Sequence, residues 1–182
     1  MQDTPAIKVT YTAIVTVETP YVVHMSANKT GNTTSGNMTV YNFENTIKMP
    51  SYLIALAVGN LEETSMGERT SVITEPEKMA EVVDVLESLP TLLDSAETYL
   101  TPYIWGNYSI LILPPSFPMG GMENPLLTFA SPTIITTDKS QVYVATHEIA
   151  HSWTGNDVTC ENWSNLWLNE GFTVFEERKV SA

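Results

Sequence analysis

The sequence predicts an α+β fold, in which a β-rich segment precedes a segment of mixed helices and strands. The first observation is the alternation of bulky apolar and polar residues over residues 7–17 and 41–47, which is typical of strands with one solvated face. The second is that apolar residues adopt helical spacing only after about residue 60. This order suggests a β unit joined to an α/β or α+β unit, which we divide into residues 1–59 and 60–182.

The β-rich segment divides into four expected strands and one loop. The strands are expected at 7–17, 21–25, 41–47 and 52–58. Pro20 closes the first of them, and the almost entirely apolar run that ends at Gly59 predicts that the last strand is buried. Residues 28–39 are rich in Asn, Thr and Gly and have no apolar period, so we predict a loop there.

The mixed segment begins with two expected helices separated by a proline. Thr74 at the cap and Pro76 in the first turn predict the start of the first helix, and apolar residues follow at helical spacing. Pro90 should break or kink that helix, and a second is expected at 91–100. Strands are expected at 71–74, 109–113 and 126–130.

Two further helices are expected at about 139–154 and 164–178. Thr137 or Asp138 is suited to cap the earlier one, because both residue types accept hydrogen bonds from the first free N–H groups of a helix. Gly155 is suited to end it, because glycine tolerates the left-handed backbone of a helix C-terminus.

The composition excludes several classes of protein. The chain of 182 residues carries 21 acidic and 8 basic side chains, a formal net charge of −13, which argues against nucleic-acid binding. An apolar content of 43% argues against disorder, and no apolar run reaches the roughly 20 residues of a membrane span. The first residues lack the features of a secretory signal, and Cys160 is the only cysteine, so we expect a cytoplasmic location.

The strongest chemical signal is the run His147-Glu148-Ile149-Ala150-His151. Residues four apart on a helix are neighbours, with Cβ atoms about 5–6 Å apart, so two imidazoles on one face can bind one zinc ion. Glu148, about 100° around the helix from His147, would lie beside the metal, where it can hold a metal-bound water. The sequence therefore predicts a zinc site on this helix.

A third zinc ligand is predicted on the following helix. Glu170 is separated from His151 by 18 residues, and a turn near Gly155 with an antiparallel return would bring its carboxylate to the metal. Two histidines and one carboxylate leave a fourth position open for water, which is the arrangement of catalytic zinc sites. The alternative is a chance motif in a soluble α+β domain.

A weaker candidate site is the run Gly120-Gly121-Met122-Glu123-Asn124. Two glycines let the backbone approach a ligand closely, and an acidic group beside them can bind a cation such as a free amine. The alternative is an ordinary Gly-Gly turn with a solvated glutamate.

Three motifs occur in a fixed order along the chain. They are Gly120-Gly121-Met122-Glu123-Asn124, His147-Glu148-Ile149-Ala150-His151-Ser152-Trp153-Thr154-Gly155-Asn156 and Trp167-Leu168-Asn169-Glu170-Gly171-Phe172. In this combination the chain resembles the gluzincin-type zinc aminopeptidases, and within them the leukotriene-A(4) hydrolase and aminopeptidase B branch. Residues 52–59 and 113–118 resemble that branch as well, so the resemblance covers nearly the whole chain.

The resemblance implies a fold and a metal site. Residues 1–59 would be the end of an N-terminal β domain, and residues 60–182 the first half of a thermolysin-like zinc peptidase catalytic domain. His147, His151 and Glu170 would bind one Zn²⁺ ion. Glu148 would be the general base that activates the zinc-bound water.

The resemblance also implies a substrate. Glu123, with Gly120, Gly121 and Met122, would bind the free N-terminus of a peptide and align its scissile carbonyl. The reaction would be zinc-dependent hydrolysis of the N-terminal peptide bond. Peptides with a free N-terminus are therefore the expected partners, whereas nucleic acid is not.

The chain also departs from the family pattern. The family's catalytic domain continues beyond residue 182 and carries a downstream tyrosine that stabilises the oxyanion, so we expect this chain to be a fragment. The missing tyrosine leaves a non-catalytic zinc-binding fragment as one alternative. The resemblance to the leukotriene-A(4) hydrolase branch leaves a second, an epoxide hydrolase acting on a lipid epoxide. Met119 stands where the epoxide-hydrolase branch usually has Tyr, which weakens the second alternative.

Other polar residues near the motifs are expected to have ordinary roles. Glu176 and Glu177 are expected on a solvated helix face. A role for Asn169 or Glu177 in orienting a zinc ligand is the alternative.

Overall fold

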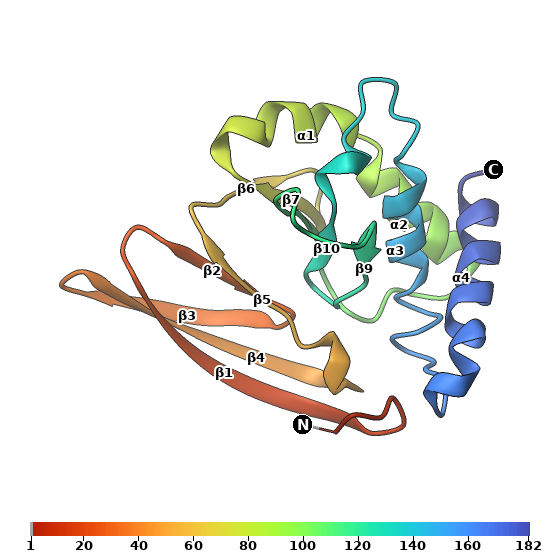
Figure 1. Ribbon diagram of the computed structural model, residues 1–182, viewed down its shortest axis with the longest axis horizontal. Helices are drawn as coiled ribbons and strands as arrows, with labels where there is room; N and C mark the ends of the chain where they lie inside the picture. Colours follow the sequence, from red (N-terminus) through yellow and green to blue (C-terminus); the bar gives the residue numbers. More distant parts are fainter. Residues whose placement is uncertain (1) are drawn as a thin grey trace.

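A computed structural model describes residues 2–182 of the chain. Within these residues the strands form a three-stranded, a two-stranded and a five-stranded sheet. Figure 1 shows the two smaller sheets on one side of the molecule, and the five-stranded sheet with the helices on the other. The expected α+β fold is therefore confirmed.

The two smaller sheets are antiparallel and are built from residues 8–59. Their strands are β1 (Lys8–Glu18), β2 (Val22–Met25), β3 (Asn28–Ser35), β4 (Met38–Pro50) and β5 (Leu56–Gly59). The order β1-β4-β3 forms the larger sheet, and β2 pairs with β5 in the smaller one. They share a small core made of Val23, Met25, Ala27, Tyr41 and Phe43.

Two predictions for this segment were wrong in whole or in part. Residues 28–35 form strand β3, paired with β4, where a loop was predicted. Every residue of β3 except Gly31 is exposed, so no apolar period marks the strand. The run 52–58 is not one buried strand: Ser51–Leu53 forms a 3₁₀ turn, and in β5 Leu56 is 50% exposed.

The larger sheet has the strand order β6-β7-β8-β10-β9. Its strands are β6 (Glu62–Ser65), β7 (Thr70–Thr74), β8 (Tyr108–Ile112), β9 (Gly121–Met122) and β10 (Thr128–Ala130). The three central strands are parallel, whereas β6 and β9 are antiparallel edges. The central strands were predicted; the two edges were not, because they are short and carry no apolar alternation.

Within the described residues, four α-helices lie beside the five-stranded sheet (Figure 1). They are α1 (Met79–Val85), α2 (Leu89–Tyr99), α3 (Tyr143–Ala150) and α4 (Leu166–Val180), with short 3₁₀ turns before α1 and α4. The main core includes buried side chains of α2 and α3, among them Leu89, Leu93, Ala145 and Ile149. Two helices form as predicted, but Pro90 is not the break between them: α1 ends at Val85, and Pro90 lies in the first turn of α2, where its missing N–H is tolerated.

The helix α3 is shorter than the predicted 139–154, and its predicted caps were wrong. It begins at Tyr143 without a side-chain cap, and Asp138 instead accepts a hydrogen bond from the backbone N–H of Ser140 at 3.1 Å. It ends at Ala150, with His151 at the C-cap. Gly155, which has a φ of +132°, therefore lies in the turn after the helix and does not cap it. None of the helices within residues 2–182 combines the length and the apolar character that a membrane crossing requires.

An ion pair between a loop and α2 is expected to stabilise the larger unit. Arg69 Nη1 lies 3.0 Å from Glu97 Oε1, a second Arg69–Glu97 contact completes a bidentate pair, and the backbone N–H of Tyr103 donates to the same carboxylate at 2.7 Å. The Arg69 hydrogen bond, aided by Tyr103, lowers the pKa of Glu97 below its ordinary value.

Replacing Glu97 with Gln should therefore reduce the free energy of unfolding by about 1.5–3 kcal/mol, as measured by urea denaturation near neutral pH. Because the folded-state pKa is the lower one, this stabilisation is present above the unfolded-state pKa of about 4.3 and is lost as pH falls through the folded-state value. Asp94→Asn is the control, because the Asp94 side chain is 74% exposed and makes only one contact with Arg69, a long one of 3.4 Å to Nη2. Equal losses in the two variants would contradict the assignment.

Candidate metal centre

Two histidines of the predicted zinc motif point to the same place. His147 lies on α3, and His151 follows directly after its last residue. Their ring centroids are 4.7 Å apart with the planes at 85°. His151 is only 2% exposed. The four-residue spacing therefore brings the two imidazoles to one face, as the sequence predicted.

Glu170 on α4 is the third member of this group. Its Oε2 atom lies 3.5 Å from Nε2 of His147 and 3.5 Å from Nε2 of His151. Helices α3 and α4 are packed against each other, which places the carboxylate over the two rings. Two imidazole nitrogens and one carboxylate oxygen converge within 4.8 Å of one another, and this donor set suits zinc.

The other nitrogen of each ring is held by the protein. His147 Nδ1 lies 3.0 Å from Glu177 Oε2, and His151 Nδ1 lies 2.9 Å from the carbonyl oxygen of Thr154 and 3.0 Å from Thr173 Oγ1. Acceptors at Nδ1 favour the tautomer that leaves Nε2 with a lone pair for a metal. The structure thus fits a zinc ion at the point where the Nε2 atoms converge.

Glu176 and Glu177 do not lie on a solvated helix face, so that expectation was wrong. Glu176 is 8% exposed and accepts a hydrogen bond from the Thr154 hydroxyl at 3.0 Å. The Glu177 side chain is 13% exposed and contacts His147. Asn169 forms a hydrogen bond to the loop before α4: its Oδ1 accepts from the backbone N–H of Cys160 at 3.0 Å.

Removing the Glu177 carboxylate should weaken zinc binding. Glu177→Ala leaves Nδ1 of His147 without its acceptor, and such orienting partners are typically worth about 10–100-fold in metal affinity. The zinc dissociation constant, measured by competition with a chromophoric chelator, should rise by that factor. Lys179→Ala, an exposed change on the same helix, should leave it unchanged. Equal affinity in Glu177→Ala and the unmodified chain would rule out the orienting role.

Glu148 is buried beside this group. It is 4% exposed, and its Oε2 atom has no hydrogen-bond partner in the part of the chain that the structure describes. Burial raises the pKa of Glu148 to about 8; Glu123 and Glu170 act in the same direction, and the two histidines oppose them. A buried, unpaired carboxylate next to three converging ligands is suited to exchange a proton with a bound molecule.

The packing of the site requires glycine at position 121 but not at position 120. A Cβ atom at Gly121 would lie 2.1 Å from Glu148 Oε1, so only glycine lets strand β9 approach this carboxylate. A Cβ atom at Gly120 would meet nothing within 4 Å. Met122 completes β9 and packs half-buried against the main core.

Glu123 follows β9 and faces the same centre. Ligand atoms of Glu123, Glu148 and His151 lie within 4.8 Å of one another. The Asn156 side chain donates a hydrogen bond from Nδ2 to the carbonyl oxygen of Glu123 at 2.7 Å, and the Asn156 backbone N–H donates to the carbonyl oxygen of His151 at 3.0 Å. Asn156 therefore ties the Glu123 turn to the end of the metal helix, a link that sequence reasoning missed.

These residues line a cavity of about 370 Å³. Six of the predicted site residues contribute to its wall: Gly121, Met122, Glu123, Glu148, His151 and Glu170. His147 and Gly120 do not, although His147 belongs to the metal group. Four other residues line the cavity and were not predicted as site residues from the sequence: Tyr52, Met119, Trp163 and Leu166.

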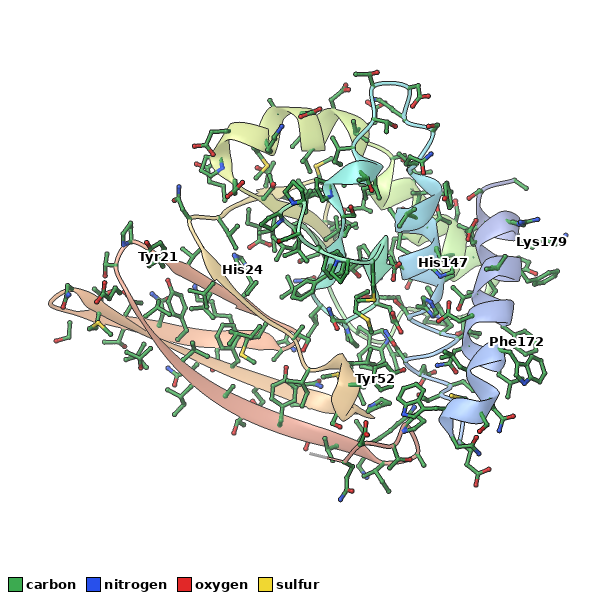
Figure 2. All side chains as sticks on the ribbon, in the orientation of Figure 1. Tyr21, His24, Tyr52, His147, Phe172 and Lys179 are labelled. Carbon is green, nitrogen blue, oxygen red and sulfur yellow. The ribbon has the colours of Figure 1, made fainter. Side chains whose placement is uncertain are left out.

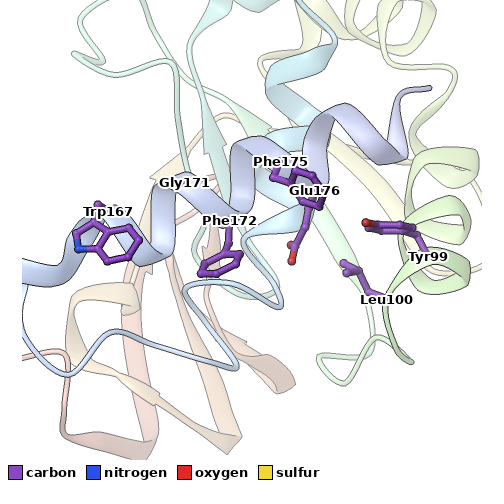
Figure 3. A pocket seen from close by; sticks show the side chains of 7 residues that line it. All are labelled: Tyr99, Leu100, Trp167, Gly171, Phe172, Phe175 and Glu176. Atoms are coloured by element: carbon purple, nitrogen blue, oxygen red, sulfur yellow. The ribbon is translucent and has the colours of Figure 1, made fainter.

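A larger hollow lies elsewhere, on the outer side of α4. It has a volume of about 580 Å³ and is lined mainly by apolar side chains, with Trp167, Phe172 and Phe175 along α4 and Tyr99 opposite them (Figure 3). Figure 2 shows Phe172 projecting away from the sheet. No candidate metal ligand lines this hollow, so it is separate from the proposed site.

Comparison with known proteins identifies the family. Residues 83–182 match the Peptidase family M1 domain, and residues 1–53 match the Peptidase M1 N-terminal domain. The chain belongs to peptidase family M1. The resemblance that the three motifs indicated is thereby confirmed, and the order of the two matched regions agrees with the predicted order of a β unit and a catalytic unit.

This M1 chain is similar to relatives along its whole length. It is 48% identical over 184 residues to leukotriene A-4 hydrolase of Xenopus laevis, and 44% identical over 184 residues to leucine aminopeptidase 2 of Aspergillus terreus. Native yeast LTA4 hydrolase has the same fold, with a TM-score of 0.89 and 41% identity over 98% of this chain. The M1 chain spans 30% of the length of each of the two relatives and 28% of the yeast structure.

Proposed function

We propose that this chain carries the metal centre of a zinc aminopeptidase that hydrolyses the N-terminal bond of peptides. The observation that carries the proposal is the convergence of His147, His151 and Glu170 beside the buried Glu148 in one cavity. A similar relative is named leucine aminopeptidase 2, which supports the substrate class. We further propose that residues 1–59 form the end of the N-terminal β domain, and residues 60–182 the first half of the catalytic domain.

The proposed cofactor is one Zn²⁺ ion, held by His147, His151 and Glu170. When bound, zinc polarises a peptide carbonyl and lowers the pKa of water at the metal from about 15.7 to about 7. The carboxylate of Glu148 takes the proton of the attacking water and passes it to the leaving amine. Its burial favours this role, because a carboxylate with a raised pKa binds and releases a proton near neutrality.

Glu123 is proposed to select the substrate, together with Gly120, Gly121 and Met122. A peptide with a free N-terminus carries an ammonium group, which pairs with the Glu123 carboxylate, whereas an internal peptide segment lacks that charge. The hydrogen bond from Asn156 fixes the backbone from which Glu123 projects. We also propose a cytoplasmic location. A chain with a single cysteine cannot form an internal disulfide, which fits a reducing compartment.

Hydrolysis of an aminoacyl reporter tests the function. The zinc-loaded chain should release the amino acid from leucine p-nitroanilide but not from its N-acetyl derivative, because acetylation removes the ammonium group. A chelator should abolish turnover, and added zinc should restore it. Equal turnover of the two substrates would contradict an aminopeptidase.

Two alternatives give different results in the same experiment. A non-catalytic zinc-binding chain would bind zinc and turn over neither reporter. An epoxide hydrolase is suggested by the relative named leukotriene A-4 hydrolase, and it would consume a lipid epoxide faster than it consumes the peptide reporter. A direct comparison of peptide and epoxide turnover separates these outcomes.

A further inference from the structure

Tyr52 enters the metal cavity from the β unit. It belongs to the 3₁₀ turn Ser51–Leu53, between β4 and β5 (Figure 2), whereas the other lining residues come from β9 with its flanking residues and from the region of α3 and α4. An edge-to-face contact with Trp163, with ring centroids 4.9 Å apart, fixes the phenol ring. The side chain is therefore held at the cavity wall by packing.

The hydroxyl group of Tyr52 makes no hydrogen bond of regular geometry within residues 2–182, although its oxygen atom is buried. The Asn169 side chain lies close enough to act on the pKa of the phenol, which burial raises above its ordinary value, but its geometry does not satisfy the hydroxyl. A buried polar group without a partner is energetically costly, so such groups are rare unless a ligand or water completes them. Because Tyr52 lines the metal cavity, a molecule bound there is a suitable partner for this hydroxyl.

The other polar side chains of the cavity supply mainly acceptors. Glu123, Glu148 and Glu170 accept hydrogen bonds when ionised, and Nε2 of His151 faces the metal centre. The hydroxyl of Tyr52 is thus a neutral donor in a wall rich in carboxylates. A peptide carries carbonyl oxygens, which the carboxylates cannot bind directly.

We propose that Tyr52 is a further substrate-binding residue, whose hydroxyl donates a hydrogen bond to a carbonyl oxygen of the peptide in the metal cavity. The inference rests on the proposed peptidase function and adds a contact from the β unit to it. The contact works with Glu123: one residue binds the ammonium group and the other a carbonyl oxygen of the same molecule.

Binding of two matched probes tests the contact. Leucinamide carries an ammonium group and one carbonyl, whereas 3-methylbutylamine carries the ammonium group alone. Calorimetry on the zinc-loaded Glu148→Gln chain avoids turnover of the amide. Adding Tyr52→Phe should weaken leucinamide binding by roughly 5–50-fold, the effect of one lost buried hydrogen bond, and should leave 3-methylbutylamine binding unchanged.

Tyr108→Phe is the matched control. The hydroxyl of Tyr108 is also buried and without a partner among the described residues, but Tyr108 lies in β8 and does not line the cavity. It should change neither probe. Two results would overturn the inference. One is a fall in zinc affinity with Tyr52→Phe, because the hydroxyl would then act on Glu170. The other is equal weakening of the binding of both probes.

The probe experiment also separates this inference from the function on which it rests. If leucinamide binds to the chain and Tyr52→Phe binds it equally well, the contact is wrong and the function stands. If neither probe binds to the zinc-loaded chain, the proposed function fails and the contact fails with it. Should Tyr52→Phe not fold, the preference of the unmodified chain for leucinamide over 3-methylbutylamine decides: equal affinities overturn the contact.

Discussion

Exchange of Glu148 for Gln is expected to lower kcat/KM for an aminoacyl reporter by about 10²–10⁴-fold while zinc stays bound. Gln has nearly the same shape but cannot accept a proton, and Glu148 is not a member of the converging metal group of His147, His151 and Glu170. The Glu148 carboxylate is buried and its Oε2 is unpaired, so its replacement breaks no hydrogen bond of that atom. Steady-state kinetics with zinc analysis of the same sample measures both effects.

The control for this variant is Glu62→Gln, an exposed change in β6 that should leave turnover and zinc content unaltered. Turnover of Glu148→Gln within tenfold of the unmodified chain would show that another group takes the proton. Loss of zinc from Glu148→Gln would instead mean that Glu148 is a ligand.

His151→Ala is expected to weaken zinc binding by at least about 10²-fold, more than the removal of an orienting residue does. The substitution removes one of the three proposed zinc ligands. A zinc ion held by His147 and Glu170 alone would have two coordination positions without a protein ligand. A competition titration with a chromophoric chelator measures the dissociation constant. Activity should fall in parallel at limiting zinc.

Two further variants make this result specific. His24→Ala removes the third histidine of the chain, which lies in β2 outside the metal group, and should leave zinc affinity unchanged. Because His151 is buried, its loss can also disturb the fold, so Glu170→Gln serves as a second test at a side chain that is 48% exposed. Unaltered zinc affinity in both ligand variants would refute the site.

The sequence predicted most elements whose side chains alternate between core and solvent. Strand β1 and the central strand β8 were found this way, because burial on one or both faces leaves a pattern in the sequence. Strand β3 was missed, because it is joined to β4 by backbone hydrogen bonds while its side chains are exposed. The apolar run 52–58 misled in the opposite direction, since part of it lies in a turn and part is exposed.

The convergence of His147, His151 and Glu170 was predictable, because it follows from one helical spacing and one helix return. Tyr52 and Asn156 were not predictable as site residues. Tyr52 comes from a turn far earlier in the chain, and Asn156 acts through a backbone carbonyl. Neither relationship leaves a local pattern, since the first depends on how the two units pack and the second on how a loop of the larger unit packs against the turn after β9.

Anomalous diffraction at the zinc edge, on crystals of the zinc-loaded chain, tests the central claim most directly. We expect one strong peak within about 2.0–2.2 Å of Nε2 of His147, Nε2 of His151 and a carboxylate oxygen of Glu170. Glu148 should lie close to the peak without binding the metal directly. No peak between these three side chains, or a peak held by other residues, would contradict the account.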